Sequence, residues 1–253
     1  MASKITVTII TLNEAHNIER CIMGVAPIAD EIIVLDAFST DNTVEHCKKL
    51  GVRVEQRKWE GYAASKNYLN SLATHPFIFS IDADEVPDEK LLASINRVKE
   101  EGLNLNAVYE VNRLTNYCGK WIKHSGWYPD RKIRIFSNEN TKWEGNYVHE
   151  ELVFSNSPEV IRLAGHLLHY SYYSQEEHSE RADRYSALTA QKMHQKGKQA
   201  GCFKPYLSAV GRFLSMYIIK KGMLDGKAGL QIACISAKSN IFKYKELRRL
   251  NRG

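Results

Sequence analysis

The chain has 253 residues, 43% of them hydrophobic and 25% charged, which excludes a disordered chain and predicts a globular protein with a sizeable core. Its net charge of +6 is uneven, because residues 175–253 carry 16 Lys/Arg against 6 Asp/Glu whereas residues 1–174 are mildly acidic. The five cysteines are an odd number, which excludes a complete disulfide framework and fits free thiols in a reducing compartment.

The first segment is a short β-rich run, residues 5–12, after Met-Ala-Ser-Lys. It lacks the longer apolar stretch and the cleavage site of a signal peptide. No apolar run in the chain approaches the roughly 20 residues that a membrane-spanning helix needs. We therefore expect a cytoplasmic protein, which can still lie peripherally on the inner face of the plasma membrane.

Residues 1–104 alternate between strand and helix patterns. The helical stretches carry apolar residues at spacings of three and four, and the last stretch has Asp88 as a candidate N-cap and Gly102 as a stop signal. This alternation predicts an α/β fold with a mostly parallel, doubly wound sheet. The predicted strands are 5–12, 31–36, 52–57 and 77–81.

The pattern changes after residue 104. Residues 105–174 combine strand patterns with polar and aromatic loops, so they are interpreted as the second half of the same domain, with an extended sheet. Residues 175–253 have helical spacing throughout and predict a basic, amphipathic helical extension. The predicted strands of the second half are 107–114, 132–136, 160–163 and 167–170.

Short polar and acidic side chains follow three of the predicted strands. In an open α/β sheet, ligands bind beyond the carboxyl ends of the strands, so these side chains are expected to line one site. Their convergence is stronger evidence than any single motif. The residues are Thr11-Leu12-Asn13-Glu14 after the first strand, Asp36 and Ser39-Thr40-Asp41-Asn42-Thr43 after the second, and Asp82-Ala83-Asp84-Glu85 after the fourth.

The acidic group at residues 82–85 predicts a divalent metal site. Three carboxylates within four positions repel one another, and a divalent cation compensates this repulsion. Such a cation can also neutralise a diphosphate leaving group. The alternative is a surface turn in which Asp84 and Glu85 begin the next helix, with Pro87 in its first turn. Asp36 can accept hydrogen bonds from a ribose or base, and its alternative role is to cap the following helix.

The ordered set of motifs resembles the signatures of the family 2 glycosyltransferases, which have a Rossmann-like GT-A fold that binds nucleotide-diphospho-sugars. The segment 59–67, Trp-Glu-Gly-Tyr-Ala-Ala-Ser-Lys-Asn, is similar to a branch that includes lipopolysaccharide core glucosyltransferases. The resemblance covers about the first 175 residues and is looser at 222–226. The other matching segments are 126–130, 134–136, 148–150 and 169–171.

The resemblance implies roles in donor binding. By position, Thr11, Asn13, Glu14 and Asp36 would line the nucleotide pocket. Lys66 would lie near the donor and offset phosphate charge, Asp82 would face the ribose, and Asp84 would bind Mg²⁺ or Mn²⁺. The predicted donor site therefore consists of seven residues: Thr11, Asn13, Glu14, Asp36, Lys66, Asp82 and Asp84.

Two further positions bear on the donor site. The broader fold often supplies a late histidine to the metal or the diphosphate, which makes His169 the candidate, and its alternative is a buried strand histidine bonded to backbone. The chain departs from the commonest family pattern at 36–39, where Asp-Ala-Phe-Ser replaces a small or acidic pair followed by Gly-Ser. Phe38 therefore changes the shape of the pocket for the base, which in the family is often uracil.

An inverting transfer needs a carboxylate that takes the proton of the attacking acceptor hydroxyl. The transition state resembles an oxocarbenium ion, as in glycoside hydrolysis. Asp130, Glu150 and Glu151 are the candidates. The family's base lies in an acidic pair well after the metal motif, so Glu150 is preferred and Asp130 comes second. The alternative for Glu150 is a loop carboxylate paired with Arg131 or Arg134.

The acceptor side is predicted from aromatic residues and from the tail. Trp127 and Tyr128 lie in an expected loop and can contact a sugar ring, although core packing is the alternative. Residues 206–219 form an apolar helical stripe that is followed by Lys220-Lys221. Such a helix can lie in a membrane interface, or it can simply pack on the catalytic domain.

The sequence therefore predicts an inverting, metal-dependent glycosyltransferase that moves a hexose from a nucleotide-diphospho-sugar, such as a UDP-sugar, to a cell-surface glycan or glycolipid, as in lipopolysaccharide core synthesis. An anionic membrane surface is a further expected partner. Nucleic acid is not expected, because the positive charge is confined to the tail and no recognition motif is present. Two alternatives remain: a nucleotidyltransferase, which should have a Gly-rich basic loop after its first strand, and a non-catalytic module that recruits a membrane or a partner.

Overall fold

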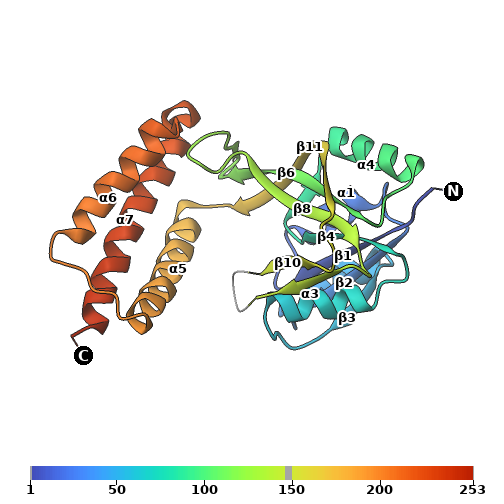
Figure 1. The fold of residues 1–253 in the computed structure, drawn as a ribbon, viewed down its shortest axis with the longest axis horizontal. Helices are drawn as coiled ribbons and strands as arrows, with labels where there is room; N and C mark the ends of the chain where they lie inside the picture. Colours follow the sequence, from blue (N-terminus) through green and yellow to red (C-terminus); the bar gives the residue numbers. More distant parts are fainter. Residues whose placement is uncertain (1, 146–149, 253) are drawn as a thin grey trace. The chain divides into compact units, whose positions relative to one another are not determined.

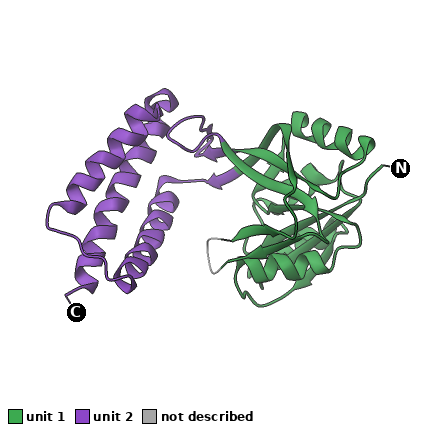
Figure 2. Ribbon diagram, viewed as in Figure 1, with its two compact units in different colours: residues 1–113, 130–169 green, residues 114–129, 170–253 purple. Residues whose placement is uncertain are grey.

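The structure is a computed structural model that describes residues 2–145 and 150–252. It has two compact units (Figure 2), the first formed by residues 1–113 and 130–169 and the second by residues 114–129 and 170–253. The chain passes from the first unit to the second along two long strands, β6 (Ala107–Tyr117) and β11 (Glu159–Tyr172).

A mixed sheet forms the centre of the first unit (Figure 1). Four parallel strands stand in the order β3-β2-β1-β4, and β8, β6, β11 and β5 continue the sheet beyond β4. The α/β class, the mixed sheet and the C-terminal helices are therefore as predicted, and the first four strands lie within one residue of their expected ends. The strands are β1 (Ile5–Thr11), β2 (Glu31–Asp36), β3 (Arg53–Gln56), β4 (Phe77–Asp82), β5 (Glu85–Pro87) and β8 (Asp130–Ser137).

Helices cover both faces of this sheet, as the alternation of side chains along β1 requires. Ile5, Val7 and Ile9 pack in one buried cluster with α1 (Ile18–Val25), α2 (Thr43–Lys49) and α4 (Glu89–Glu101). Ile10 points to the other face and packs with α3 (Tyr62–Ser71). A two-stranded sheet of β9 (Thr141–Glu144) and β10 (Glu151–Phe154) lies beside α3 on that face.

The region around α4 both confirms and corrects the sequence analysis. Asp88 caps the helix, since its Oδ1 accepts a hydrogen bond from the backbone N–H of Leu91 at 2.8 Å, and Gly102 ends it with φ +97°. Pro87, however, lies in β5, which pairs antiparallel with β11, so it does not begin a helix. The strands predicted at 160–163 and 167–170 form one strand, because Gly165 interrupts the apolar pattern without ending the pairing.

The second unit is a bundle of helices. It contains α5 (Gln175–Gln195), α6 (Lys204–Leu214), a π-helical turn η1 (Ser215–Ile219), a 3₁₀ turn η2 (Gly222–Asp225) and α7 (Gly226–Leu250). α7 packs against both α5 and α6. Among the described helices, none is both long enough and apolar enough to span a bilayer.

Asp225 organises the loop 122–129 within this unit. The Asp225 side chain is 3% exposed, and its carboxylate accepts hydrogen bonds from the backbone N–H groups of Lys123 and His124 and from the hydroxyl of Ser125. These hydrogen bonds give the segment 222–226 a structural role. Its glycines have no Cβ, which lets η2 pack closely against its neighbours. A Cβ at Gly222 would lie 2.7 Å from the Ser125 hydroxyl oxygen.

The variant Gly229→Ala tests this close packing. Its new Cβ would lie 1.9 Å from the carbonyl oxygen of Gly222, so the η2 turn would have to move. We expect the free energy of unfolding to fall by about 2 kcal/mol, as measured by urea denaturation. Gly211→Ala is the matched control, because a Cβ there meets no atom within 4 Å and alanine favours the helix by up to about 1 kcal/mol. Equal stability of the two variants would contradict the contact.

A cluster of four rings fills the same unit beside η1. The ring centroids of Tyr117, Trp127, Tyr172 and His178 are 4.7–5.9 Å apart. Trp127 is thus a packing residue, as the alternative interpretation held. Burial, with a smaller contribution from Arg181, lowers the pKa of His178 to about 4. The folded state therefore holds this ring neutral.

The lowered pKa of His178 makes stability depend on pH. An unfolded chain protonates histidine near pH 6.5, so it takes up a proton that the folded chain refuses until about pH 4. The contribution of the neutral His178 ring to the free energy of unfolding is complete above pH 6.5 and is lost as the pH falls toward 4. The urea concentration at the unfolding midpoint should be lower at pH 5 than at pH 7, and we expect His178→Phe to make this difference smaller. His194→Gln, an exposed histidine of α5, should leave the difference unchanged, and equal pH profiles for all three proteins would refute this role.

Candidate functional site

The register of the parallel strands brings the three polar groups to one edge of the sheet. Thr11 at the end of β1 pairs with Asp36 at the end of β2, and Ile10 pairs with Asp82 at the end of β4. Strands two places apart in a sheet are separated by about 10 Å, so Asp36 and Asp82 lie on opposite sides of β1 at that distance. The predicted convergence of the three strand ends is confirmed.

Asp36 is a fully buried carboxylate that organises the turn after β2. Its Oδ2 accepts hydrogen bonds from the backbone N–H of Ser39 at 3.0 Å and from the Gln56 amide at 2.9 Å, and its Oδ1 accepts one from the Ser39 hydroxyl. It does not cap the next helix, whose first residue Thr43 is held by Asp41 instead.

The two turns after β1 and β2 are joined by hydrogen bonds. The backbone N–H of Asn13 donates to the Ser39 hydroxyl at 2.8 Å, and the Asn13 side-chain oxygen accepts from the backbone N–H of Thr40 at 2.8 Å. The Glu14 backbone N–H donates to the Thr43 hydroxyl at 2.9 Å. Phe38, at the position of the family's glycine, has φ +62° and is 55% exposed, so the left-handed turn is kept at a cost in backbone strain.

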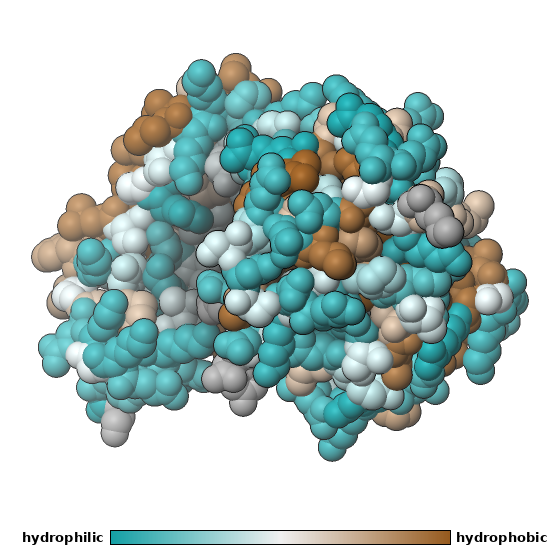
Figure 3. All heavy atoms as spheres, turned by 45° about the vertical axis from the view of Figure 1, so that its right-hand side comes forward, coloured by the Kyte–Doolittle hydropathy of each residue, from teal (hydrophilic) through white to brown (hydrophobic). Residues whose placement is uncertain are grey.

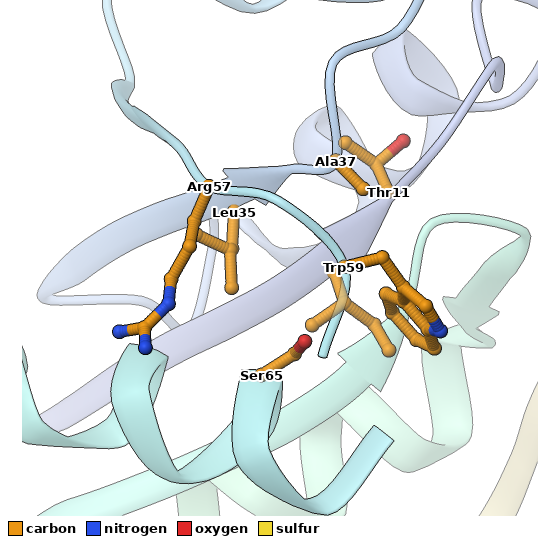
Figure 4. A pocket seen from close by; sticks show the side chains of 7 residues that line it. Thr11, Leu35, Ala37, Arg57, Trp59 and Ser65 are labelled. Carbon is orange, nitrogen blue, oxygen red and sulfur yellow. The ribbon is translucent and has the colours of Figure 1, made fainter. Parts of the chain in front are cut away.

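A small hollow lies beside these turns on the α3 face (Figure 4). Thr11 is the one predicted donor residue among those that line it, and its buried hydroxyl has no hydrogen-bond partner among the described residues. The rest of the lining includes Arg57, Trp59 and Ser65, which come from the segment after β3 and from α3. Trp59 is 43% exposed and its ring meets Tyr62 edge-on at 4.7 Å.

Buried arginines surround the carboxylates at the end of β4. Glu85 is fully buried and its Oε1 accepts hydrogen bonds from Arg134 and, at 3.2 Å, from Arg113. Arg134 also lies 3.2 Å from Asp82, and Lys66 lies 3.7 Å from Asp82 on the other carboxylate oxygen. Burial alone would raise the pKa of Asp82, but Lys66 and Arg134 hold it well below its usual range.

This network corrects one step of the sequence argument. The repulsion among residues 82–85 is compensated for Asp82 and Glu85 by cationic side chains, so it does not by itself require a metal. The arginines were not predicted as part of the site. A signal was present in β8, where Arg134 interrupts an apolar run, since a buried arginine needs buried carboxylates as partners.

Asp84, the remaining carboxylate of this turn, faces a histidine. Its Oδ2 lies 3.2 Å from Nε2 of His169, and the two side chains are 17% and 14% exposed. The pairing of β5 with β11 produces this contact, because His169 is in register with Glu85, the neighbour of Asp84. Among the described residues, no group of three or more His, Cys, Asp or Glu side chains could hold a metal by itself.

Lys66 links the acidic group to the segment that precedes β10. Its side chain is almost fully buried, and Nζ lies 3.2 Å from Glu150 Oε1 and 4.5 Å from the ring centroid of Trp143. Glu150 is thus ion-paired, as the alternative interpretation held, but its partner in the structure is Lys66 in place of Arg131 or Arg134. The neighbouring His149, part of one matching segment, lies outside the described residues.

Asp130, the second candidate base, is held by two cations at the start of β8. Its Oδ2 lies 2.7 Å from Arg113 and its Oδ1 lies 3.2 Å from Lys132. Although partial burial raises the pKa of Asp130, Arg113 and Lys132 lower it below its usual range. A carboxylate with a lowered pKa is a weak proton acceptor, so this environment weighs against Asp130 as the base.

The known proteins that are similar to most of this chain include two bacterial glycosyltransferases. An uncharacterized glycosyltransferase of Rickettsia typhi is 28% identical over 256 residues, which are 98% of this chain and 88% of the relative. The lipopolysaccharide core biosynthesis glycosyltransferase LpsC of Rhizobium meliloti is 27% identical over 218 residues, which are 83% of this chain and 78% of LpsC. The resemblance to a lipopolysaccharide core branch is thereby confirmed.

Among solved structures, glucosyl-3-phosphoglycerate synthase from Mycobacterium tuberculosis, in complex with Mn²⁺, UDP and glucosyl-3-phosphoglycerate, is similar over 45% of this chain and 44% of its own. The sequence identity is 23% and the TM-score is 0.37, so this likeness is confined to a part of each protein.

The model of glycosyl transferase family 2 matches residues 6–150, which is more than half of the chain and includes every strand end of the candidate site. The expected Rossmann-like GT-A fold is confirmed with it. From the matched motifs and the sheet that positions them, the chain belongs to glycosyl transferase family 2.

Proposed function

We propose that this protein is an inverting, metal-dependent hexosyltransferase that moves a sugar from a nucleotide-diphospho-sugar to a hydroxyl of a cell-surface or lipid-linked glycan. The observation that carries the proposal is the meeting of three polar strand ends, at Thr11, Asp36 and Asp82, with Asp84 facing His169 beside them. The similarity to LpsC supports a lipopolysaccharide core or a related glycan as the acceptor.

The nucleotide would bind at the turns after β1 and β2. The unpartnered hydroxyl of Thr11 offers a hydrogen bond into the hollow, and the exposed face of Trp59 offers a surface for stacking. The shape of these two turns is fixed by the hydrogen bonds that Asn13, Glu14 and Asp36 make within the protein. The ribose would therefore be contacted by other groups at the edge of the hollow. Uracil is the proposed base, from the family resemblance.

Asp84 and His169 fit a divalent ion bound together with the diphosphate. Asp84 Oδ2 and His169 Nε2 lie 3.2 Å apart, and carboxylate oxygens and imidazole nitrogens are both groups that ligate divalent metals. Mg²⁺ and Mn²⁺ often take only one or two protein ligands and complete their shell with phosphate oxygens and water. The ion would neutralise the charge that develops on the diphosphate leaving group.

The variant Asp84→Asn tests the metal site. It removes the anionic ligand, so we expect Mn²⁺-dependent binding of UDP-sugars to weaken at least tenfold, as measured by calorimetry with and without a chelator. Glu89→Gln is the matched control, because it removes an exposed carboxylate at the start of α4 without touching the site. Undiminished metal-dependent binding by Asp84→Asn would exclude this residue as a metal ligand.

Glu150 is proposed as the general base. Its carboxylate would take the proton of the acceptor hydroxyl while the hydroxyl oxygen bonds to the anomeric carbon. The bond from that carbon to the diphosphate breaks on the opposite face, so the configuration inverts and the nucleoside diphosphate leaves. Lys66, at 3.2 Å from Glu150 and 3.7 Å from Asp82, positions the base relative to the acidic group after β4.

The variant Glu150→Gln tests the base. It keeps the size of the side chain but cannot accept the proton, so we expect the transfer rate to fall by about 10²- to 10⁴-fold while donor binding stays close to wild type. Product stereochemistry, read by NMR, should show inversion. The control is Glu151→Gln, which changes the exposed neighbour in β10. Normal turnover by Glu150→Gln would refute the assignment, and retention would refute the mechanism.

Family membership leaves the nucleotidyltransferase alternative without support, since the loop after β1, Thr11-Leu12-Asn13-Glu14, is neither Gly-rich nor basic. The same variants separate an enzyme from a non-catalytic recruiting module. In a recruiting module the site carboxylates would be dispensable, and no metal-dependent binding of nucleotide would occur.

A further inference from the structure

A continuous row of exposed apolar side chains runs along α6 and the turns that follow it. The first four positions, at spacings of four, three and four residues, lie on one face of the helix. Their exposed fractions reach 77% at Phe203 and 70% at Leu207. The row consists of Phe203, Leu207, Val210 and Leu214, followed by Ile218, Ile219, Met223 and Leu224.

This row is not the packing face of the helix. α6 already buries Ala209 against its unit, and Met216 and Phe213 pack in the cluster that joins η1 to α7. The row is therefore a second apolar face, which packing within the helical unit does not explain. Figure 3 shows brown, apolar spheres gathered where α6 runs, at the left-hand edge of the view. A contiguous exposed apolar surface of this kind marks a site that a membrane or a protein partner covers.

The charge around the row has one sign. Residues 196–245 contain ten Lys/Arg and a single acidic residue, Asp225. Asp225 is 3% exposed and its carboxylate is engaged by the loop 122–129, so it does not offset the positive charge at the surface. Arg212, Lys221 and Lys227 are exposed beside the apolar residues.

We propose that this surface, the apolar row with its lysines and arginines, binds the interface of an anionic lipid bilayer. Apolar side chains enter the boundary between headgroups and acyl chains, while Lys and Arg meet anionic headgroups. A second copy of the chain fits the surface poorly, because a symmetric contact would bring two sets of positive charges together. An acidic protein partner would satisfy the charge but is supported by nothing else in the structure.

The surface rests on observations separate from those of the donor site, and it adds a partner to the proposed function. A transferase held by α6 and its following turns would meet lipid-linked acceptors in the plane of the membrane. The association would be peripheral, since none of the described helices can span a bilayer.

The experiment measures binding of the full chain to vesicles of phosphatidylcholine alone and of phosphatidylcholine mixed with phosphatidylglycerol. We expect strong co-sedimentation only with the anionic vesicles, and weakening by high salt. Leu207→Asp with Ile219→Asp should reduce binding about tenfold or more, because two apolar side chains lose their burial. Leu188→Asp is the matched control: it lies on α5, is also exposed, and should bind as wild type does.

A second pair of variants tests the charge independently of the apolar contacts. Arg212→Gln with Lys227→Gln should weaken binding on the order of fivefold per charge removed, whereas Lys192→Gln on α5 should not. Equal binding to neutral and anionic vesicles, or undiminished binding by Leu207→Asp with Ile219→Asp, would overturn the proposal. A stable dimer in light scattering that these substitutions dissociate would assign the surface to a second copy.

The outcome can be separated from that of the proposed function. Asp84→Asn, which should lose donor binding, is expected to bind vesicles normally. Leu207→Asp with Ile219→Asp, which should lose vesicle binding, is expected to bind Mn²⁺ and UDP-sugar normally in calorimetry, which also shows that its first unit is folded. Loss of donor binding in this variant would contradict the separation of the two sites.

Discussion

The ion pairs between Arg134 and the carboxylates of Asp82 and Glu85 are the constraint on which the site depends. Glu85 is fully buried, and an unpaired buried carboxylate costs several kcal/mol. Arg134 comes from β8, which pairs antiparallel with β4, so the acidic turn is fixed by a strand far along the chain. The acidic turn is therefore held in position before any ligand arrives, which is the kind of preorganisation that electrostatic stabilisation needs.

Lys66 extends this network from β4 to the segment that precedes β10. It contacts Asp82 on one side and Glu150 on the other, and its ammonium group lies over the ring of Trp143 from β9. Three elements that are distant in the sequence, β4, α3 and the segment before β10, are thus tied by one ammonium group. Glu150 and the acidic turn share Lys66 as an ion-pair partner, so a substitution at either one changes the charge that the other faces.

Most of the donor half could be predicted from the sequence, because its features are local. The strands that end at Thr11, Asp36 and Asp82 each combine an apolar run with a polar end, and parallel pairing then makes the convergence almost inevitable. Arg134 in the apolar run of β8 indicated a buried ion pair, but it did not indicate which carboxylates are the partners, since Arg134 and Arg113 reach them across antiparallel pairings that no local pattern specifies. The β9–β10 pair was missed because each strand has only four residues.

The charge balance bears on how a donor would bind. In the network, Asp82, Glu85, Asp130 and Glu150 face cationic side chains, whereas Asp84 faces the imidazole of His169, a group that can also ligate a metal. A diphosphate adds negative charge that this balanced network cannot offset without breaking its own pairs. Two protein ligands alone hold a divalent ion weakly, but phosphate oxygens complete the shell. On the proposed assignment of Asp84 and His169 to the metal, ion and donor would therefore bind together, each supplying what the other lacks.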